Sequence, residues 1–135
     1  MRDKLIEILV KLNKELNGSL LKLDIPTYVD KIHKAATIRS IYKDGELKAF
    51  IAYYDNDENS QKAYLTMLAV SKDCWHLGYG KLLLEQSIKE LREKGFQLYS
   101  LEVNKDNLTA IALYKKFGFK VAHGEEGRLK MEKTL

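Results

Sequence analysis

The spacing of apolar residues divides the chain into a helical opening and a longer part with strand-like alternation. Residues 1–17 carry leucine and isoleucine at helical spacing, and Asn17-Gly18 end that pattern. Pro26 fits the first turn of a second, short helix that continues through Ile32. The sequence therefore predicts two helices before the first strand.

From residue 37 onward the apolar period is two, as expected for half-buried strands. Residues 37–43 and 47–54 alternate in this way and meet at Asp44-Gly45, a dipeptide typical of tight hairpins. A polar loop at 55–61 separates this hairpin from a third apolar run at 63–70. We expect an antiparallel meander of three strands.

The remaining residues alternate between helix and strand patterns. The expected helices cover 78–94 and 107–117, and the expected strands cover 97–103, 118–122 and 128–134. Gly95 and Gly118 stand where the left-handed residue after each helix belongs. The strand–helix–strand step over 63–103 requires a parallel pair and a right-handed crossover. The predicted fold class is α/β with a mixed sheet flanked by helices, in a single domain.

Composition describes an ordinary globular protein. With 135 residues, 45% apolar and 31% charged, the chain is long enough for one core and too short for two. One cysteine cannot form a disulfide framework or a cysteine-based metal site, so we expect no metal and a reducing, cytoplasmic location. No segment approaches the roughly 20 apolar residues of a membrane span, and charges interrupt the N-terminal apolar stretch.

Charge narrows the class of partner. The formal net charge is +4 and the isoelectric point is about 9.0, which suits an anionic ligand such as a phosphorylated cofactor. Nucleic acid is the weaker interpretation, because the lysines alternate with acidic residues and form no long basic run.

The stretch HLGYGK, residues 76–81, lies between a predicted strand and a predicted helix. Its glycines allow a tight turn, and the helix N-terminus adds partial positive charge, so the turn suits a phosphate or pyrophosphate. On so short a match, a plain sharp turn is the favoured explanation of the glycines. A P-loop is excluded because Leu82 follows Lys81, and a dinucleotide fingerprint is excluded because Leu83 replaces its third glycine.

The stretch 101–119 contains the second set of candidates. Glu102 points away from the sheet face of Leu101 and Val103, so with both faces covered it would be a partly buried carboxylate that needs a partner. Asn107 suits a helix N-cap. Tyr114 shares a helix face with Ala110, Leu113 and Phe117, which by itself indicates core packing.

Together, LTMLAV, GYGKLLL and LEVNKDNLTAIALYKKFGF occur in an order and spacing that resembles the GNAT acetyltransferase superfamily. The resemblance covers about residues 36–122, and residues 1–35 fit only the helical, substrate-variable opening of that family. It implies a single N-acetyltransferase domain over 1–135 that moves the acetyl group of acetyl-CoA (coenzyme A) to a primary amine, by direct attack in a ternary complex.

The resemblance also implies roles for particular residues. The glycine turn would hold the cofactor pyrophosphate through backbone amides, the preceding strand would align the pantetheine arm, and an asparagine would contact the cofactor. These cofactor residues are Leu68, Ala69, Val70, His76, Leu77, Gly78, Tyr79, Gly80, Lys81 and Asn107. Tyr114 matches the general acid. The LEV-x-x-x-N spacing is similar to that of bacterial ribosomal-protein alanine acetyltransferases, which implies Glu102 as general base.

One position departs from the family pattern. Trp75 stands three residues before the first glycine, where the family usually has Gln or Arg, so a contact to the cofactor is missing there. Lys72 or Lys81 would have to compensate electrostatically.

Several alternatives remain open from sequence. Cys74 with nearby His76 suggests a covalent acetyl-cysteine route, although a loop cysteine without chemistry is the simpler interpretation. Tyr64, His33 and His123 are weaker candidates for the base. A non-catalytic coenzyme A-binding module is the alternative function. The amine acceptor is not identified, no nucleic acid or membrane partner is expected, and the protein is expected to be a monomer or homodimer.

Overall fold

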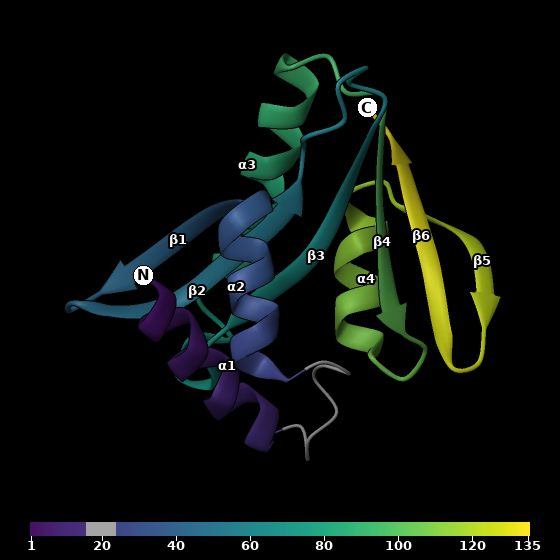
Figure 1. The fold of residues 1–135 in the computed structure, drawn as a ribbon. Helices are drawn as coiled ribbons and strands as arrows, with labels where there is room; N and C mark the ends of the chain where they lie inside the picture. Colours follow the sequence, from purple (N-terminus) through teal and green to yellow (C-terminus); the bar gives the residue numbers. More distant parts are fainter. Residues whose placement is uncertain (16–23) are drawn as a thin grey trace. The chain divides into compact units, whose positions relative to one another are not determined.

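A computed structural model describes residues 1–15 and 24–135, drawn in Figure 1. The expected end of the first helix at Asn17-Gly18 lies outside the described residues. In chain order the elements are α1 (Arg2–Glu15), α2 (Ile25–Ala35), β1 (Thr37–Lys43), β2 (Glu46–Tyr54), β3 (Lys62–Val70), the 3₁₀ turn η1 (Lys72–Cys74), α3 (Tyr79–Glu93), β4 (Leu98–Asn104), α4 (Leu108–Lys116), β5 (Lys120–Glu125) and β6 (Arg128–Thr134).

The sheet is mixed, as predicted. Its strand order is β1-β2-β3-β4-β6-β5. Strands β3 and β4 pair in parallel from Lys62↔Leu98 to Leu65↔Leu101, and β6 pairs antiparallel with both β4 and β5. The parallel pair flanks α3 in sequence, which is the predicted strand–helix–strand crossover. At the β1–β2 hairpin, Asp44 and Gly45 both have positive φ, 53° and 78°, in agreement with the dipeptide signal.

By contacts between Cα atoms the chain divides into two compact units, and each is described by itself. The first unit comprises Met1–Ala52 and Met67–Leu84, and the second comprises Tyr53–Thr66 and Glu85–Leu135. Strands β2 and β3 each contribute residues to both.

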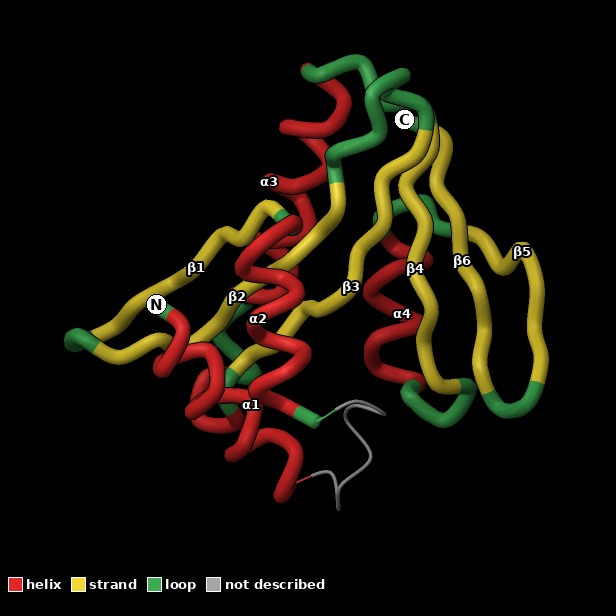
Figure 2. The backbone as a smooth tube through the Cα atoms, viewed as in Figure 1, coloured by secondary structure: helices red, strands yellow, loops and turns green. Residues whose placement is uncertain are grey.

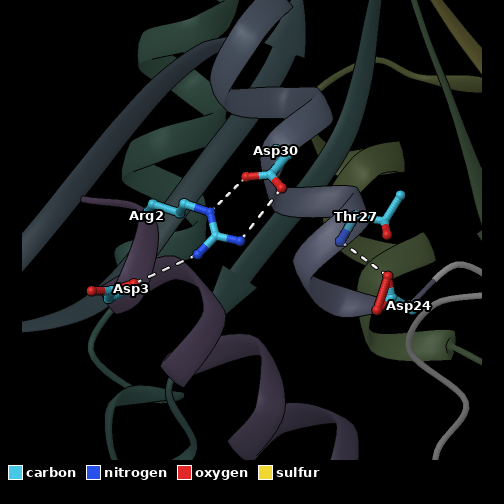
Figure 3. A network of polar contacts seen from close by, with 5 residues as sticks. All are labelled: Arg2, Asp3, Asp24, Thr27 and Asp30. Carbon is cyan, nitrogen blue, oxygen red and sulfur yellow. Dashed lines mark hydrogen bonds and ion pairs between the residues drawn. The ribbon is translucent and has the colours of Figure 1, made fainter.

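In the first unit, α1 and α2 bury the apolar stripes that the sequence pattern predicted. Leu5, Leu9 and Ile32 are fully buried. Figure 3 shows the polar contact that joins the two helices: Arg2 Nε lies 2.6 Å from Asp30 Oδ1. This hydrogen bond from Arg2 holds the pKa of Asp30 below its ordinary value. Because both side chains are exposed, the pair fixes helix orientation more than it adds stability.

The start of α2 has a capping residue that the pattern of Pro26 alone did not reveal. The Asp24 side chain accepts a hydrogen bond from the Thr27 backbone N–H at 3.1 Å, as Figure 3 also shows. An N-cap of this kind satisfies one of the N–H groups that a helix start leaves without a partner. The helix therefore begins at Ile25, directly after its cap.

In the second unit, β4 presents one apolar face and one polar face. Tyr99, Leu101 and Val103 are buried, whereas Glu102 between them is exposed. Tyr99 donates its hydroxyl to Ser87 of α3 at 3.0 Å. Its ring also lies 5.5 Å from that of Phe119, between centroids. The apolar face of β4 is therefore the one that packs against α3 and against Phe119. Figure 2 shows β4 beside β6, with β5 next to β6.

Two details differ from the sequence prediction. Strand β5 runs over Lys120–Glu125 instead of 118–122, and every one of its residues is exposed. Without a buried side there is no apolar alternation to mark where it begins and ends. In α4 the most buried residues are Ile111 and Tyr114, so Ala110, predicted on the core face, lies at its margin.

Within the described part of the chain, no helix is long and apolar enough to span a membrane.

Candidate cofactor turn and catalytic residues

The predicted site residues fall into both units. The first unit contains the residues assigned to the cofactor chain and pyrophosphate, namely Leu68, Ala69, Val70, His76, Leu77, Gly78, Tyr79, Gly80 and Lys81. The second unit contains Glu102, Asn107 and Tyr114. The geometry below is that of each group within its own unit.

The glycine turn is formed by backbone conformation that its sequence requires. Gly78 has φ +79°, and an added Cβ would meet no atom within 4 Å, so the glycine is needed for its dihedral angle and not for space. Its carbonyl accepts the N–H of Leu82 at 3.0 Å, which closes the first turn of α3. The first N–H groups of a helix have no acceptor within it, and they carry the positive end of the helix dipole. The turn therefore has the geometry of an anion site.

The segment leading to this turn is held by successive backbone hydrogen bonds. Ser71 N–H donates to Lys48 C=O at 2.7 Å, Cys74 N–H donates to Ser71 C=O at 2.8 Å, and Leu77 N–H donates to Cys74 C=O at 3.2 Å. Ordered backbone on both sides of Gly78 means that its N–H groups need no large rearrangement to receive a ligand.

Trp75 has a structural contact of its own. Its indole Nε1–H donates to the carbonyl oxygen of Val70 at 2.7 Å. That carbonyl belongs to the strand end predicted to align the pantetheine arm, and the indole already occupies one of its acceptor positions. Where the resemblance leads one to expect Gln or Arg, this position therefore makes an internal hydrogen bond.

A cluster of charged side chains connects β2 to the same segment. Lys48 Nζ lies 2.9 Å from Asp73 Oδ2 and 3.1 Å from Glu46 Oε2, and Ser71 Oγ donates to Asp73 Oδ1 at 2.5 Å. The hydrogen bond from Ser71, followed by that from Lys48, lowers the pKa of Asp73 to about 2. The bond to Asp73 raises the pKa of Lys48. Both groups are thus charged over the whole physiological range.

This cluster was not found from the sequence. Lys48 lies 25 residues from Asp73, and only the folded arrangement in which β2 and β3 are neighbours brings them together. The sequence signal for this cluster is a lysine at a half-buried strand position followed later by S-x-D. That pattern is too common in proteins to predict a charged cluster.

In the second unit, Glu102 has the partner that its position requires. Arg128 Nε lies 3.6 Å from Glu102 Oε2, and Arg128 Nη1 donates to Asn104 Oδ1 at 3.1 Å. The expectation of a partly buried carboxylate is wrong, because the Glu102 side chain is 50% exposed. Its neighbours on that face of β4, Ser100 and Asn104, are short and leave it open to solvent.

Arg128 was missed for a definable reason. The β4–β6 register places Arg128 opposite Asn104 and Lys130 opposite Glu102, so the contact is diagonal across two strands. The two strands were predicted, but their register was not.

Tyr64, a weaker base candidate, lies on β3 beside Ser100 in the parallel register. Burial, and secondarily the negative charge of Glu102, raise the pKa of its phenol. A phenol with a raised pKa stays protonated near neutrality, so Tyr64 is a hydrogen-bond donor beside Glu102 and a poor base.

Tyr114 lies on the other side of β4 from the Glu102 carboxylate. Its ring is 5.7 Å from Phe119, which in turn packs against Tyr99 on the apolar face. Alternate residues of a strand point to opposite faces, so the Glu102 side chain leaves β4 on the face away from this ring cluster. Burial raises the pKa of Tyr114 to about 12.

Asn107 is the N-cap of α4, as predicted. Its side-chain Oδ1 accepts the N–H of Ala110 at 3.1 Å. Because the cap uses the amide oxygen, the NH₂ group is the part of this side chain that can donate to a ligand.

Cys74 is 2% exposed, and its thiol is hydrogen-bonded to Asp73. A buried thiol that donates to a carboxylate is poorly suited to become an exposed thiolate nucleophile. The described residues contain no group of three or more His, Cys, Asp or Glu side chains that could hold a metal ion.

A mixed sheet with a strand–glycine turn–helix unit defines an α/β protein. Comparison with protein families makes the class specific. Residues 7–119 match the Acetyltransferase (GNAT) family, and the chain belongs to that family.

Individual relatives agree with this assignment. The chain is 43% identical over 61 residues to the [Ribosomal protein bS18]-alanine N-acetyltransferase of Escherichia coli, covering 45% of this chain and 41% of that protein. It is 33% identical over 86 residues to a probable spermine N(1)-acetyltransferase of Bacillus subtilis subsp. natto, covering 58% and 56%. The chain therefore spans about half the length of these relatives.

The fold agrees as well. The crystal structure of PaiA N-acetyltransferase from Thermoplasma acidophilum in complex with coenzyme A superposes with a TM-score of 0.79 at 22% identity, covering 99% of this chain and 92% of that chain.

Proposed function

We propose that this protein is an N-acetyltransferase that moves the acetyl group of acetyl-CoA to a primary amine. The observation that carries the proposal is the ordered turn at Gly78, whose φ of +79° opens α3 with its N–H groups available to an anion, in a chain of the GNAT family. Residues 36–122 would form the cofactor-binding core and residues 1–35 the variable substrate region.

Coenzyme A would bind through main-chain groups. The N–H groups of 78–81 would receive the pyrophosphate, and the exposed side chains of Lys72 and Lys81 would add positive charge at the turn. Leu68 and Ala69 would offer strand-like hydrogen bonds to the pantetheine arm, since the Val70 carbonyl already accepts from Trp75. The Asn107 NH₂ group would donate to the cofactor from the start of α4.

Glu102 would accept the proton that the amine must lose before it attacks. An alkylammonium with a solution pKa of about 10.4 is almost fully protonated at neutral pH, so a base is needed. Glu102 is half exposed and within reach of solvent, which suits proton removal either directly or through one water. Arg128 would orient the carboxylate, and the Tyr64 phenol would offer a hydrogen bond beside it.

Tyr114 would assist the departing thiolate. Its pKa of about 12 lies above the value of about 8.5 for an ordinary thiol, so the phenol is protonated whenever the reaction runs. Full proton transfer from such a phenol to the thiolate is uphill. We therefore assign Tyr114 to hydrogen-bond donation toward the sulfur as negative charge develops, with final protonation by solvent.

The acceptor is a primary amine, and two types deserve direct comparison. The relatives named above act, by their names, on the alanine of a ribosomal protein and on spermine. The acidic loop at 55–61 gives no support for a cationic acceptor, because Asp55 pairs with Lys94 at 2.7 Å and Asp57 accepts backbone N–H groups of its own loop. We further propose a cytoplasmic location and a monomer or homodimer.

The experiment is a thiol-release screen with acetyl-CoA against alanine-initiated peptides, lysine peptides, spermine and amino sugars. The proposal expects turnover with at least one amine that exceeds hydrolysis of acetyl-CoA. Tight binding of coenzyme A without turnover across the panel would instead identify a non-catalytic coenzyme A-binding module.

A further inference from the structure

A basic groove lies in the second unit, away from every residue assigned above. It has a volume of about 560 Å³ and is lined by α3, the end of α4 and β6. Its apolar lining consists of Ile88 and Phe117. Hollows of 300–1,000 Å³ with apolar walls and a few polar groups are the usual size of small-molecule sites.

The charge of this groove is strongly one-sided. Lys89 and Arg92 from α3, Lys116 from α4 and Lys133 from β6 face a single carboxylate, Glu85. Each of these cations lacks an ion-pair partner among residues 1–15 and 24–135. Four cations around one hollow repel one another, and an anion would relieve that repulsion.

Lys133 lies against the end of α4. A Cβ built on Gly118 would lie only 2.6 Å from Lys133 Nζ, so the ammonium group occupies the space that a side chain would take. The C-terminal end of a helix carries partial negative charge, which stabilises a cation there. One of the four charges therefore lies next to the helix end, and the glycine leaves room for it.

The groove is separate from the catalytic residues of its own unit. It lies at the last residues of α4, whereas Asn107 caps the first turn of that helix, about 13 Å away over nine residues. Lys133 pairs with Tyr99, near the start of β4, whereas Glu102 lies near its end. A ligand here would not occupy the place of Asn107 or Glu102.

We propose that this groove is a second ligand site, for a small phosphorylated molecule with an aromatic ring, such as a nucleoside diphosphate. Lysine and arginine bind phosphate oxygens, and the four cations together with Glu85 have a net charge of +3, which matches a fully ionised nucleoside diphosphate. Phe117, which is partly exposed, provides the apolar surface against which a planar base would pack. The chemistry thus selects phosphate and ring together.

The test is calorimetric titration of ADP into the protein saturated with coenzyme A, so that the turn at Gly78 is already filled. We expect one ADP to bind. Lys89→Gln combined with Lys116→Gln should weaken it at least tenfold, and Glu85→Gln should tighten it severalfold by removing the one repulsive charge. Lys120→Gln, on the exposed strand β5, is the matched control and should change affinity less than twofold.

Loss of ADP binding on saturation with coenzyme A would overturn the proposal, because ADP would then use the cofactor turn alone. Equal weakening by Lys120→Gln and by the double variant would also overturn it. If coenzyme A itself does not bind, the proposed function fails, and ADP titration of the free protein still tests the groove. The proposal then requires that ADP affinity falls in the double variant and is unchanged in Gly78→Ala.

Discussion

The indole N–H of Trp75 donates to the carbonyl oxygen of Val70 at 2.7 Å, joining the residue before the glycine turn to the last residue of β3. In a family that usually places Gln or Arg at this position, the aromatic residue changes what the position does. Trp75 joins the end of β3 to the turn by a hydrogen bond, and it offers no charged group to the ligand. Cofactor affinity should therefore depend on Trp75 through backbone order.

Trp75→Phe removes the indole donor and keeps an aromatic ring. A neutral hydrogen bond contributes about 0.5–1.5 kcal/mol, so coenzyme A affinity should fall about two- to tenfold while turnover at saturating cofactor stays the same. Calorimetry measures the affinity. Tyr42→Phe, which alters an exposed aromatic residue of β1, is the control and should leave affinity unchanged. Unaltered coenzyme A affinity in Trp75→Phe would show that the Trp75–Val70 hydrogen bond is not needed for cofactor binding.

Gly78→Ala tests the turn itself. An alanine at φ +79° costs about 1–2 kcal/mol of backbone strain, and a shift of the turn would misalign its N–H groups. Gly95→Ala is a matched control, because Gly95 has φ +87° at the other end of α3 and equally open space. Both variants should lose similar stability in thermal melts. Only Gly78→Ala should lose coenzyme A affinity, and equal loss by Gly95→Ala would contradict the assignment.

The Lys48–Asp73 pair predicts a specific acid response. The pKa of Asp73 is lowered to about 2 in the folded protein, below its ordinary value of 3.8. Its contribution to stability is therefore complete above about pH 4 and is lost as the pH falls through 2. Asp73→Asn should lower the melting temperature at pH 5, and its difference from wild type should shrink toward pH 2. A difference that is constant with pH would contradict the pair.

Tyr114→Phe should reduce turnover about 10- to 100-fold and leave coenzyme A affinity intact, because the phenol acts on the leaving sulfur. Tyr99→Phe is the control within the same ring cluster. It loses the hydrogen bond to Ser87 and about 0.5–1.5 kcal/mol of stability, without an effect on turnover. Similar rates for Tyr114→Phe and wild type would remove the phenol from the reaction.

The glycine turn, the Asn107 cap and the sheet face on which Glu102 lies were predicted from sequence because each depends on local pattern. Gly78 needs only its own dihedral angle, Asn107 acts on a residue three positions ahead, and the face of Glu102 follows from strand alternation. Local rules of this kind need no knowledge of the tertiary structure.

The two ion pairs of the candidate site that were missed are long-range. Lys48 meets Asp73, and Arg128 meets Glu102, only after strand pairing and register are fixed. The exposure of Glu102 was mispredicted for the same reason, since it depends on which side chains cover that face of the sheet. Strand β5 had no apolar alternation to reveal its bounds, because all of its residues are exposed.

The most direct measurement of the central claim follows the acetyl group itself. Acetyl-CoA with an isotopically labelled acetyl group is incubated with the amine that scores highest in the screen, and mass spectrometry counts label on the amine against coenzyme A released. We predict one labelled amine for each coenzyme A, and a rate that falls about 10²–10⁴-fold in Glu102→Gln while coenzyme A still binds. Coenzyme A bound by the wild-type protein, with no labelled amine formed, would contradict the account.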